Sequence, residues 1–254
     1  MSLHQPIVLS GVCYFASDFH FGAPNQEASL KRELEVIRWL DYIKKDANHL
    51  FLLGDIFDFW FEYSGKPPNF YPHFLEKIAE LRKKNIEIYF FTGNHDMWVK
   101  NYLTKQFGIQ LFRKKQEFII NNKKFLLGHG DGLGKSEFGY KCMKSFLSCK
   151  INIRLFGLIP PKAGFAMAHF LSRKSRAMTP DYKEQFLGND KEILVQYCYQ
   201  YLANHDINYF IFGHRHLPLK ITIDKATYFN TGDWLWYNSF IHYENEPRLL
   251  FFER

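Results

Sequence analysis

The sequence predicts an α/β fold in which two β-sheets pack face to face with helices outside, together with a helical insertion at residues 134–179. In the first half, short apolar runs end abruptly in polar residues and alternate with helical patterns, which predicts parallel strands joined by right-handed crossovers. In the second half, short apolar runs recur at hairpin spacing. The chain of 254 residues, 46% hydrophobic and 23% charged, is long enough for one large core.

The first half alternates strands with helices. Strands are expected at 12–17, 49–53 and 86–91, because each run is short and rich in β-branched or aromatic residues. Helices are expected at 28–46 and 70–84, where apolar residues recur every three or four positions. This order places the three strands side by side in one sheet, with their carboxyl ends at the same edge.

The second half adds a hairpin turn, one long helix and several short strands. Asn121-Asn122 is expected to be a tight turn, and a helix is expected at 183–204. Pro160-Pro161 should divide the insertion into two helical pieces, because proline lacks the backbone N–H that would bond to the preceding helical turn. The strands are expected at 117–120, 123–127, 209–212, 219–223, 227–230, 240–243 and 249–252.

Composition and termini exclude several classes of protein. No apolar run reaches the roughly 18 residues of a membrane span. The start of the chain lacks the basic residues and apolar core of a secretory signal, so we expect a cytoplasmic protein. The cysteines form no CxxC pair, which argues against a disulfide framework or a thiolate zinc site and predicts small buried thiols. They are Cys13, Cys142, Cys149 and Cys198.

The positive charge is concentrated in the insertion. Residues 133–176 contain nine Lys and Arg but a single acid, Glu137, whereas the rest of the chain has slightly more acids than bases. The same segment is rich in large apolar side chains. A plain amphipathic insertion packed on the main domain is one explanation. The others are a lid that meets an anionic amphiphile or membrane surface, and a phosphate-binding surface for nucleic acid.

Polar residues follow five of the predicted strands. In open α/β sheets, ligands bind at the carboxyl ends of the strands. All the side chains there offer oxygen or imidazole nitrogen, which favours a divalent ion such as Mn²⁺, Fe²⁺, Zn²⁺ or Co²⁺. Seven or eight such groups exceed the needs of one ion and suit two ions that share Asp55. The residues are Asp18 and His20, Asp55, Asn94 and His95, His129, and His214 and His216.

These five blocks resemble the calcineurin-like metallophosphoesterases over residues 12–232. The blocks are Asp18-Phe-His20, Gly54-Asp55, Gly93-Asn-His-Asp96, Gly128-His129 and Gly213-His214-Arg-His216. The resemblance implies a four-layer α-β-β-α metallophosphoesterase sandwich that binds two divalent metal ions, with Mn²⁺ expected. It also implies that His95 assists catalysis and that Asp96 orients His95. Asp58 is either a further carboxylate that fixes an imidazole tautomer or a residue that structures its loop. Asp18, His20, Asp55 and His216 would hold one ion, and Asp55, Asn94, His129 and His214 the other.

The stretch after the fourth block resembles, more narrowly, the UDP-2,3-diacylglucosamine hydrolases of lipid A biosynthesis. In that family a helical lid inserted at this point receives the acyl chains. The resemblance divides the chain into a core of residues 1–133 and 180–254 and a lid of residues 134–179. Two departures from the best-known branch are His95, where that branch has Arg, and Glu137, where it has Asp. The implied substrate contacts are Asp131, Glu137, Tyr140, Arg173, Ser175 and Arg176.

The resemblance implies hydrolysis of UDP-2,3-diacylglucosamine to UMP and 2,3-diacylglucosamine 1-phosphate. The expected partners are this anionic glycolipid nucleotide and the inner-membrane surface, with peripheral attachment, no nucleic acid and no obligate protein partner. Two alternatives remain: a phosphodiesterase of the same fold acting on a nucleotide or nucleic acid, and a non-catalytic scaffold. The aliphatic and Phe side chains of the insertion favour lipid over nucleic acid. The complete set of ligand positions disfavours the scaffold.

Overall fold

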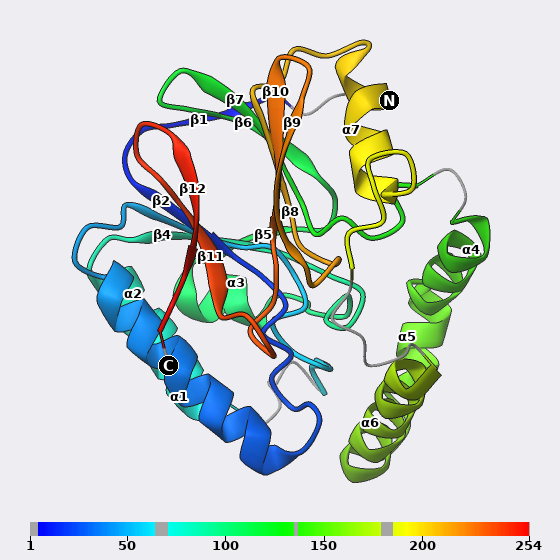
Figure 1. Cartoon of the computed structure of the whole chain (residues 1–254). Helices are drawn as coiled ribbons and strands as arrows, with labels where there is room; N and C mark the ends of the chain where they lie inside the picture. The colour runs from blue at the N-terminus through cyan, green and yellow to red at the C-terminus, as the bar shows by residue number, and fades with distance from the viewer. Residues whose placement is uncertain (1–4, 64–70, 135–136, 179–184, 254) are drawn as a thin grey trace.

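The computed structural model describes residues 5–63, 71–134, 137–178 and 185–253 and contains two six-stranded sheets (Figure 1). The first sheet runs in the order β1 (Ile7–Leu9), β6 (Gln116–Ile120), β7 (Lys123–Leu127), β8 (Tyr209–Phe212), β10 (Ala226–Thr231) and β9 (Pro218–Ile223). The second runs in the order β12 (Pro247–Phe251), β11 (Ser239–Tyr243), β2 (Cys13–Ala16), β3 (His49–Leu52), β4 (Glu87–Phe91) and β5 (Gln110–Phe112). Strands β2, β3, β4 and β5 are parallel, as the alternation with helices predicts.

Helices cover the outer faces of both sheets, which makes four layers (Figure 1). The second sheet packs on α1 (Gln26–Ile43) and α2 (Pro72–Lys83), with α3 (Tyr102–Phe107) beside them. The first sheet packs on α7 (Ile193–Leu202). Three apolar clusters correspond to the three interfaces between the layers. The predicted α-β-β-α order is confirmed.

Aromatic rings fill the space between the two sheets. Phe51 on β3 stacks on Phe15 of β2 and on Tyr89 of β4, with ring centroids 4.7 and 4.5 Å apart. Phe15 also stacks on Phe125 of β7, which belongs to the opposite sheet. Because offset stacking is favourable and these rings are fully buried, they fix how one sheet lies on the other.

Several local expectations are refined by the structure. The turn between β6 and β7 is Asn121-Asn122, and both residues have positive φ, which suits a two-residue hairpin. The short strands β1 and β5 and the helix α3 were not predicted. The helix predicted at 183–204 begins only at Ile193. Cys142 and Cys149 are exposed, so the prediction that every cysteine is buried is wrong.

The described part of the predicted insertion, residues 134–179, forms three helices, α4 (Phe138–Leu147), α5 (Lys150–Phe156) and α6 (Pro161–Met178). The predicted break at Pro160-Pro161 separates α5 from α6. A second break precedes α5, where Cys149 has an extended backbone (ψ 128°) and the side chain of Asn152 donates to the Phe146 carbonyl. The prediction of two helical pieces is therefore wrong. No helix within the described ranges is both long enough and apolar enough to cross a bilayer.

Aromatic side chains hold the insertion against the core. Phe156 of α5 lies 4.8 Å from Trp98 and 4.9 Å from Phe61, measured between ring centroids. Phe165 of α6 packs edge-on against Phe59 at 5.4 Å. Trp98, which follows the third block, also donates its indole N–H to the Leu147 carbonyl at the end of α4. The insertion is thus attached beside the loop that carries Asn94 and His95.

Candidate metal centre

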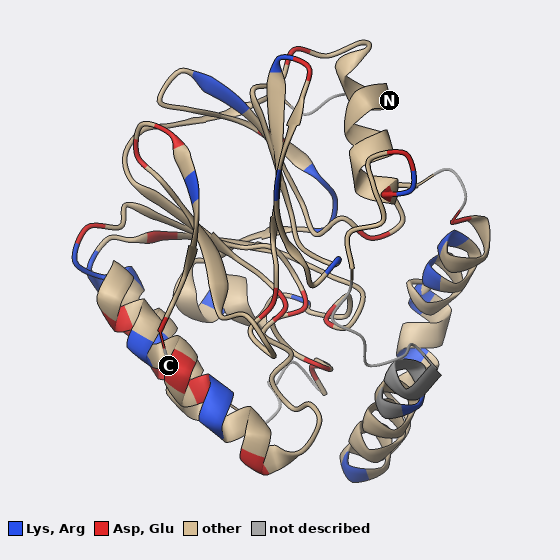
Figure 2. Cartoon of the chain, in the orientation of Figure 1, with Lys and Arg blue, Asp and Glu red and all other residues tan. Residues whose placement is uncertain are grey.

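The loops after β2, β3, β4, β7 and β8 meet at one edge of the two sheets. The His20 N–H donates to the Asp55 carbonyl at 2.9 Å, and the Gly213 N–H donates to the His129 carbonyl at 2.8 Å. Figure 2 shows acidic residues gathered in these loops, where the strands end. The edge brings together all seven predicted metal ligands. They are Asp18, His20, Asp55, Asn94, His129, His214 and His216.

Five of these ligand residues have a left-handed backbone, which is uncommon outside glycine. Their φ angles are 56° at Asp18, 45° at His20, 53° at Asp55, 67° at His214 and 56° at His216. Such a conformation costs a non-glycine residue of the order of 1–3 kcal/mol and persists where the surroundings enforce it. The loop backbone therefore turns each ligand toward a common point as soon as its strand ends.

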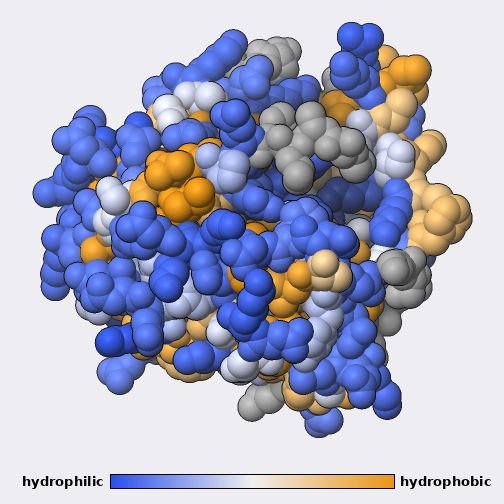
Figure 3. Space-filling view, turned by 90° about the horizontal axis from the view of Figure 1, so that it is seen from above, coloured by the Kyte–Doolittle hydropathy of each residue, from blue (hydrophilic) through white to orange (hydrophobic). Residues whose placement is uncertain are grey.

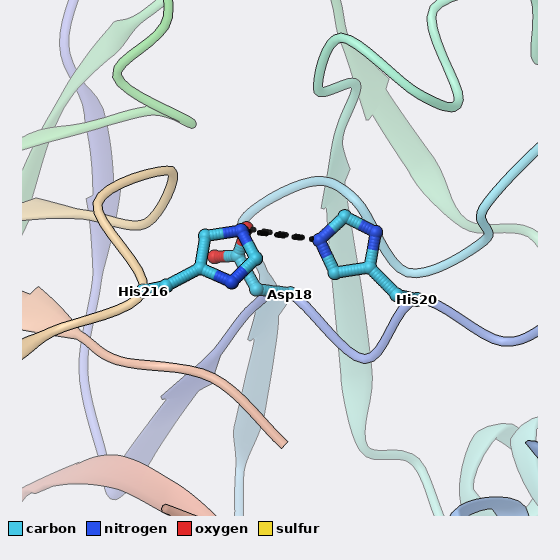
Figure 4. Close-up of side chains that lie close together, drawn as sticks. All are labelled: Asp18, His20 and His216. Carbon is cyan, nitrogen blue, oxygen red and sulfur yellow. Dashed lines mark hydrogen bonds and ion pairs between the residues drawn. The ribbon is translucent and has the colours of Figure 1, made fainter. Parts of the chain in front are cut away.

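The first cluster of potential ligand atoms joins Asp18, His20 and His216. Asp18 Oδ1 lies 3.3 Å from His216 Nε2 and 3.7 Å from His20 Nε2, and the two Nε2 atoms are 3.2 Å apart. Figure 4 shows the two imidazole rings on either side of the aspartate. Asp18 and His20 follow β2, whereas His216 follows β8, so the two sheets contribute jointly to this cluster.

The second cluster joins Asp55, His129 and His214, and Asn94 lies against it. Asp55 Oδ2 is 3.3 Å from His129 Nε2, which in turn is 3.2 Å from Asn94 Oδ1. The same Oδ2 atom is 3.9 Å from His20 Nε2 of the first cluster. The other oxygen of Asp55 accepts a hydrogen bond from the His95 N–H at 2.8 Å. Asp55 therefore presents one oxygen to both clusters.

One carboxylate oxygen of Asp18 lacks a hydrogen-bond partner among the described residues, and a bound cation would satisfy it. The other oxygen of Asp18, Oδ2, accepts hydrogen bonds from the Ser17 hydroxyl and from the His214 N–H. Its Oδ1 is buried, faces the two imidazoles and has no hydrogen-bond partner among the described residues. A buried carboxylate is costly unless it is paired or coordinates a metal. The oxygen and nitrogen donors here suit divalent transition ions, so the residues fit metal binding.

Hydrogen bonds on the far side of two rings fix which nitrogen faces the centre. His129 Nδ1 lies 2.8 Å from the Leu53 carbonyl, and His216 Nδ1 lies 3.1 Å from Asp233 Oδ2. Each ring thus directs Nε2 to the cluster, as metal-binding histidines commonly do. Asp233 is not among the residues predicted from the sequence. It lies two residues beyond the end of β10, so the same reasoning from strand ends would also have found it.

Charge and burial set the protonation of the metal-free cluster. Burial would raise the pKa of Asp18, but the neighbouring His216 and His20 outweigh it and bring the pKa to about 2. Burial lowers the pKa of His20 to about 3 and that of His214 to about 4. Burial also opposes protonation of His129, yet the Asp55 carboxylate raises the pKa of His129 to about 10. His129 is therefore in its positively charged, doubly protonated form at neutral pH.

The carboxylate beside His95 is Asp58, not Asp96. The Asp96 oxygens accept from the backbone N–H groups of Gly93 at 2.7 Å and Ile56 at 2.9 Å. His95 Nδ1 lies 3.1 Å from the Asp58 carbonyl and 3.4 Å from Asp58 Oδ1. The expected orientation of His95 by Asp96 is therefore wrong, because Asp96 is committed to joining two loops of the backbone.

The predicted substrate contacts fall into two sets. The Asp131 carboxylate accepts from the Tyr140 hydroxyl and from Lys144, and the Tyr140 ring lies 6.4 Å from that of His214. Glu137 accepts from the Gly134 N–H at 2.6 Å, just before α4. The other three lie near the end of α6, and their side chains fall outside the described residues. They are Arg173, Ser175 and Arg176.

Metal binding at pH 7 should release about one proton from His129, because a histidine ligand binds in its neutral form. His20 and His214 release none, since they are already neutral at that pH. His216 adds a further fraction of a proton, because the burial that lowers its pKa is outweighed by Asp18 and Asp233, which raise it. Titration calorimetry with Mn²⁺ in buffers of different ionisation enthalpy measures the proton count. We expect His129→Gln to lower it by about one and His73→Gln, at an exposed site on α2, to leave it unchanged. A binding enthalpy independent of buffer would contradict this assignment.

Known proteins are similar to this chain over most of its length. Residues 13–218 match the family model described as calcineurin-like phosphoesterase. The UDP-2,3-diacylglucosamine hydrolase of Porphyromonas gingivalis is 31% identical over 250 residues, which cover 93% of this chain and 95% of that protein. Proteins of the same name are 24% identical in Haemophilus influenzae, covering 87% of this chain and 90% of theirs, and 26% identical in Vibrio cholerae, covering 91% and 94%. The chain belongs to the calcineurin-like phosphoesterase family and is a hydrolase with a site for divalent metal ions.

Proposed function

We propose that this protein hydrolyses the diphosphate of UDP-2,3-diacylglucosamine to UMP and 2,3-diacylglucosamine 1-phosphate, a step of lipid A biosynthesis. The main support is the similarity to a hydrolase of that name along nearly the whole of both chains. That similarity extends over the insertion as well as the core. The insertion combines cationic side chains, which suit the diphosphate of such a substrate, with apolar side chains, which suit its acyl chains.

The cofactors are two divalent ions, with Mn²⁺ as the expected metal. Asp18, His20, Asp55 and His216 would hold one ion, and Asp55, Asn94, His129 and His214 would hold the other. The shared Oδ2 of Asp55 supports this division, since it faces imidazoles of both clusters. Bound ions would supply charge neutralisation for the diphosphate and a water of lowered pKa.

The residues of the chain position the reacting groups. An oxygen of water forms a bond to the α-phosphorus, and the bond from that phosphorus to the bridging oxygen breaks. The electron pair leaves with the sugar 1-phosphate, and the proton of water passes to solvent. His95 contacts Asp58 through Nδ1 and keeps part of its ring accessible, so Nε2 is available to hydrogen-bond a phosphoryl oxygen as charge develops there.

The insertion at residues 134–179 acts as the lipid-binding lid of the core formed by residues 1–133 and 180–254. Residues 138–178 contain eight Lys and Arg and no acid, and Figure 2 shows the charge along α4, α5 and α6. Apolar side chains are exposed on the same helices, including Phe138, Phe146 and Leu155, and Leu158 is exposed in the turn after α5. In Figure 3 apolar residues reach the surface on the side where the insertion lies in Figure 1. Burial of an acyl chain contributes about 0.8 kcal/mol per methylene, so these surfaces favour a lipid substrate.

The same surface supports peripheral attachment to the cytoplasmic face of the inner membrane. Anionic lipid attracts each Lys or Arg near its surface with about 1 kcal/mol. The alternative, a phosphodiesterase for nucleotides or nucleic acid, would require exposed rings for base stacking among the cations. Phe138 and Phe146 of the insertion are exposed, but exposed aliphatic side chains such as Ile151, Leu155 and Leu158 accompany them, and this mixture favours lipid.

Hydrolysis of UDP-2,3-diacylglucosamine in ¹⁸O-labelled water tests the substrate and the bond that breaks. With Mn²⁺ present, we expect UMP carrying one ¹⁸O atom and an unlabelled sugar 1-phosphate, because water attacks the α-phosphorus. Mass spectrometry of both products gives the result. Label in the sugar phosphate would place the attack on the other phosphorus. No turnover of the lipid alongside rapid hydrolysis of nucleotides would favour the alternative substrate class.

Replacement of His95 should slow the chemistry and leave the metals in place. We expect His95→Ala to lower kcat by roughly 10²- to 10⁴-fold, the usual contribution of a positioned acid or hydrogen-bond donor. Metal content by elemental analysis should stay at the wild-type value. Asp55→Ala is the contrasting variant and should lose both ions together. Loss of metal from His95→Ala would show that His95 is itself a ligand. Its position beside His20 and Asp55 permits that role.

Removing charge from α5 should weaken membrane binding. For the pair Lys150→Ala and Arg154→Ala we expect roughly 25-fold weaker binding to vesicles that contain phosphatidylglycerol, at about 1 kcal/mol for each cation. Co-sedimentation at low salt measures this. The control pair, Lys83→Ala and Lys105→Ala on α2 and α3, removes the same charge from exposed positions elsewhere. Equal binding by the two double variants would show that attachment depends on net charge alone.

A further inference from the structure

Asp58 connects the insertion to the metal centre. It lies in the loop after β3, three residues beyond Asp55, and is almost fully buried. On the core side, its Oδ1 is 3.4 Å from His95 Nδ1 and 3.8 Å from His20 Nδ1. On the side of the insertion, the Ser172 hydroxyl donates to both carboxylate oxygens, at 2.9 and 3.0 Å. One carboxylate thus contacts groups from both parts of the chain.

The insertion presents a polar face to Asp58. His169 and Ser172 are three residues apart on α6 and therefore lie on the same side of that helix. His169 Nδ1 is 3.6 Å from Asp58 Oδ2. Ser172 is 8% exposed, whereas Phe170 and Leu171 between them are 59% and 55% exposed. Near Asp58 the helix therefore meets the core with these two polar side chains, while Phe170 and Leu171 point outward.

The core loop is shaped to admit α6 at this point. Gly22, two residues after His20, has a φ of 109°, and a Cβ atom there would lie 2.6 Å from the Tyr71 hydroxyl. The same Cβ would lie 3.2 Å from the His169 ring and 3.4 Å from the side chain of Asp58. A larger residue would push the histidine of the insertion away from the carboxylate. The close approach of α6 to Asp58 is thus built into the loop that carries His20.

We infer that Asp58 is a positioning residue through which the docking of α6 orients His95, with Ser172 as the partner that holds its carboxylate in place. A buried carboxylate takes the orientation that satisfies its oxygens, and Ser172 donates to both. That orientation places Oδ1 beside His95 Nδ1. When α6 is docked, His95 is held for the reaction. The insertion therefore helps to assemble the reacting centre in addition to binding substrate, an inference that rests on the proposed role of His95.

Turnover of a small diester isolates this effect from lipid binding. With bis(4-nitrophenyl) phosphate and Mn²⁺, Ser172→Ala should lower kcat roughly 10- to 100-fold, the usual cost of removing a group that supports a reacting side chain. KM and metal content should not change, and Ser172→Thr should restore kcat because it keeps the hydroxyl. Ser145→Ala, at an exposed site on α4, is the matched control and should behave as wild type. Equal kcat for Ser172→Ala and Ser145→Ala would overturn the inference.

A double-mutant cycle tests whether Ser172 acts through His95. If the two belong to one unit, Ser172→Ala should have no further effect on kcat in a His95→Ala background. An undiminished loss in that background would give Ser172 a separate role and overturn the inference. The diester lacks uridine, sugar and acyl chains. Failure to turn over the lipid while the diester results hold would therefore overturn the proposed substrate and leave this inference standing.

A measurement without turnover provides a second test. In long-range ¹H–¹⁵N spectra of the Zn²⁺-loaded protein, His95 should be the Nδ1–H tautomer in wild type and in Ser145→Ala, because Nδ1 faces the Asp58 carbonyl and carboxylate. In Ser172→Ala the spectra should show a mixture of tautomers. Identical His95 signals in all three proteins would overturn the inference whatever the enzyme hydrolyses.

Discussion

The structure of the site depends on two carboxylates, Asp18 and Asp55, that are removed from water. Both are at most 1% exposed. Charges this deep are tolerated only when opposite charge and hydrogen bonds surround them. Imidazoles supply part of that compensation, and backbone N–H groups of His95 and His214 supply another part. The remaining oxygen atoms face the centre of the cluster, which explains why so many ligands from separate loops converge there.

The sequence predicted the layers and the metal ligands because both follow from one regular feature. Parallel strands end at the same edge, so polar residues that follow separate strands become neighbours whatever their distance along the chain. Asp18 and His216 illustrate this, since they are far apart in sequence and 3.3 Å apart in space. The same reasoning reaches Asp233 once β10 is recognised as one more strand of the set.

Other features were beyond sequence reasoning because they depend on contacts between segments. From the sequence, Asp96 and Asp58 are both candidates for fixing an imidazole, and adjacency favours Asp96 for His95, but adjacency in a loop says little about where a side chain points. Asp96 turns inward to backbone N–H groups, while Asp58 reaches the imidazole from another loop. Likewise, the break between α4 and α5 contains no proline, and the short strand β5 forms by pairing with β4. In each case the deciding interaction is tertiary.

The stacked rings between the sheets have a consequence for how the enzyme can diverge. Asp18 and His20 extend from one sheet and His216 from the other, so the ligand sphere spans the seam between them. A substitution at Phe15, Phe51 or Phe125 that lets one sheet slide would separate the ligands without touching them. Exchange of these aromatic residues is therefore restrained by chemistry as well as by folding. The aromatic core between the two sheets should therefore tolerate fewer substitutions than the burial of its side chains alone would predict.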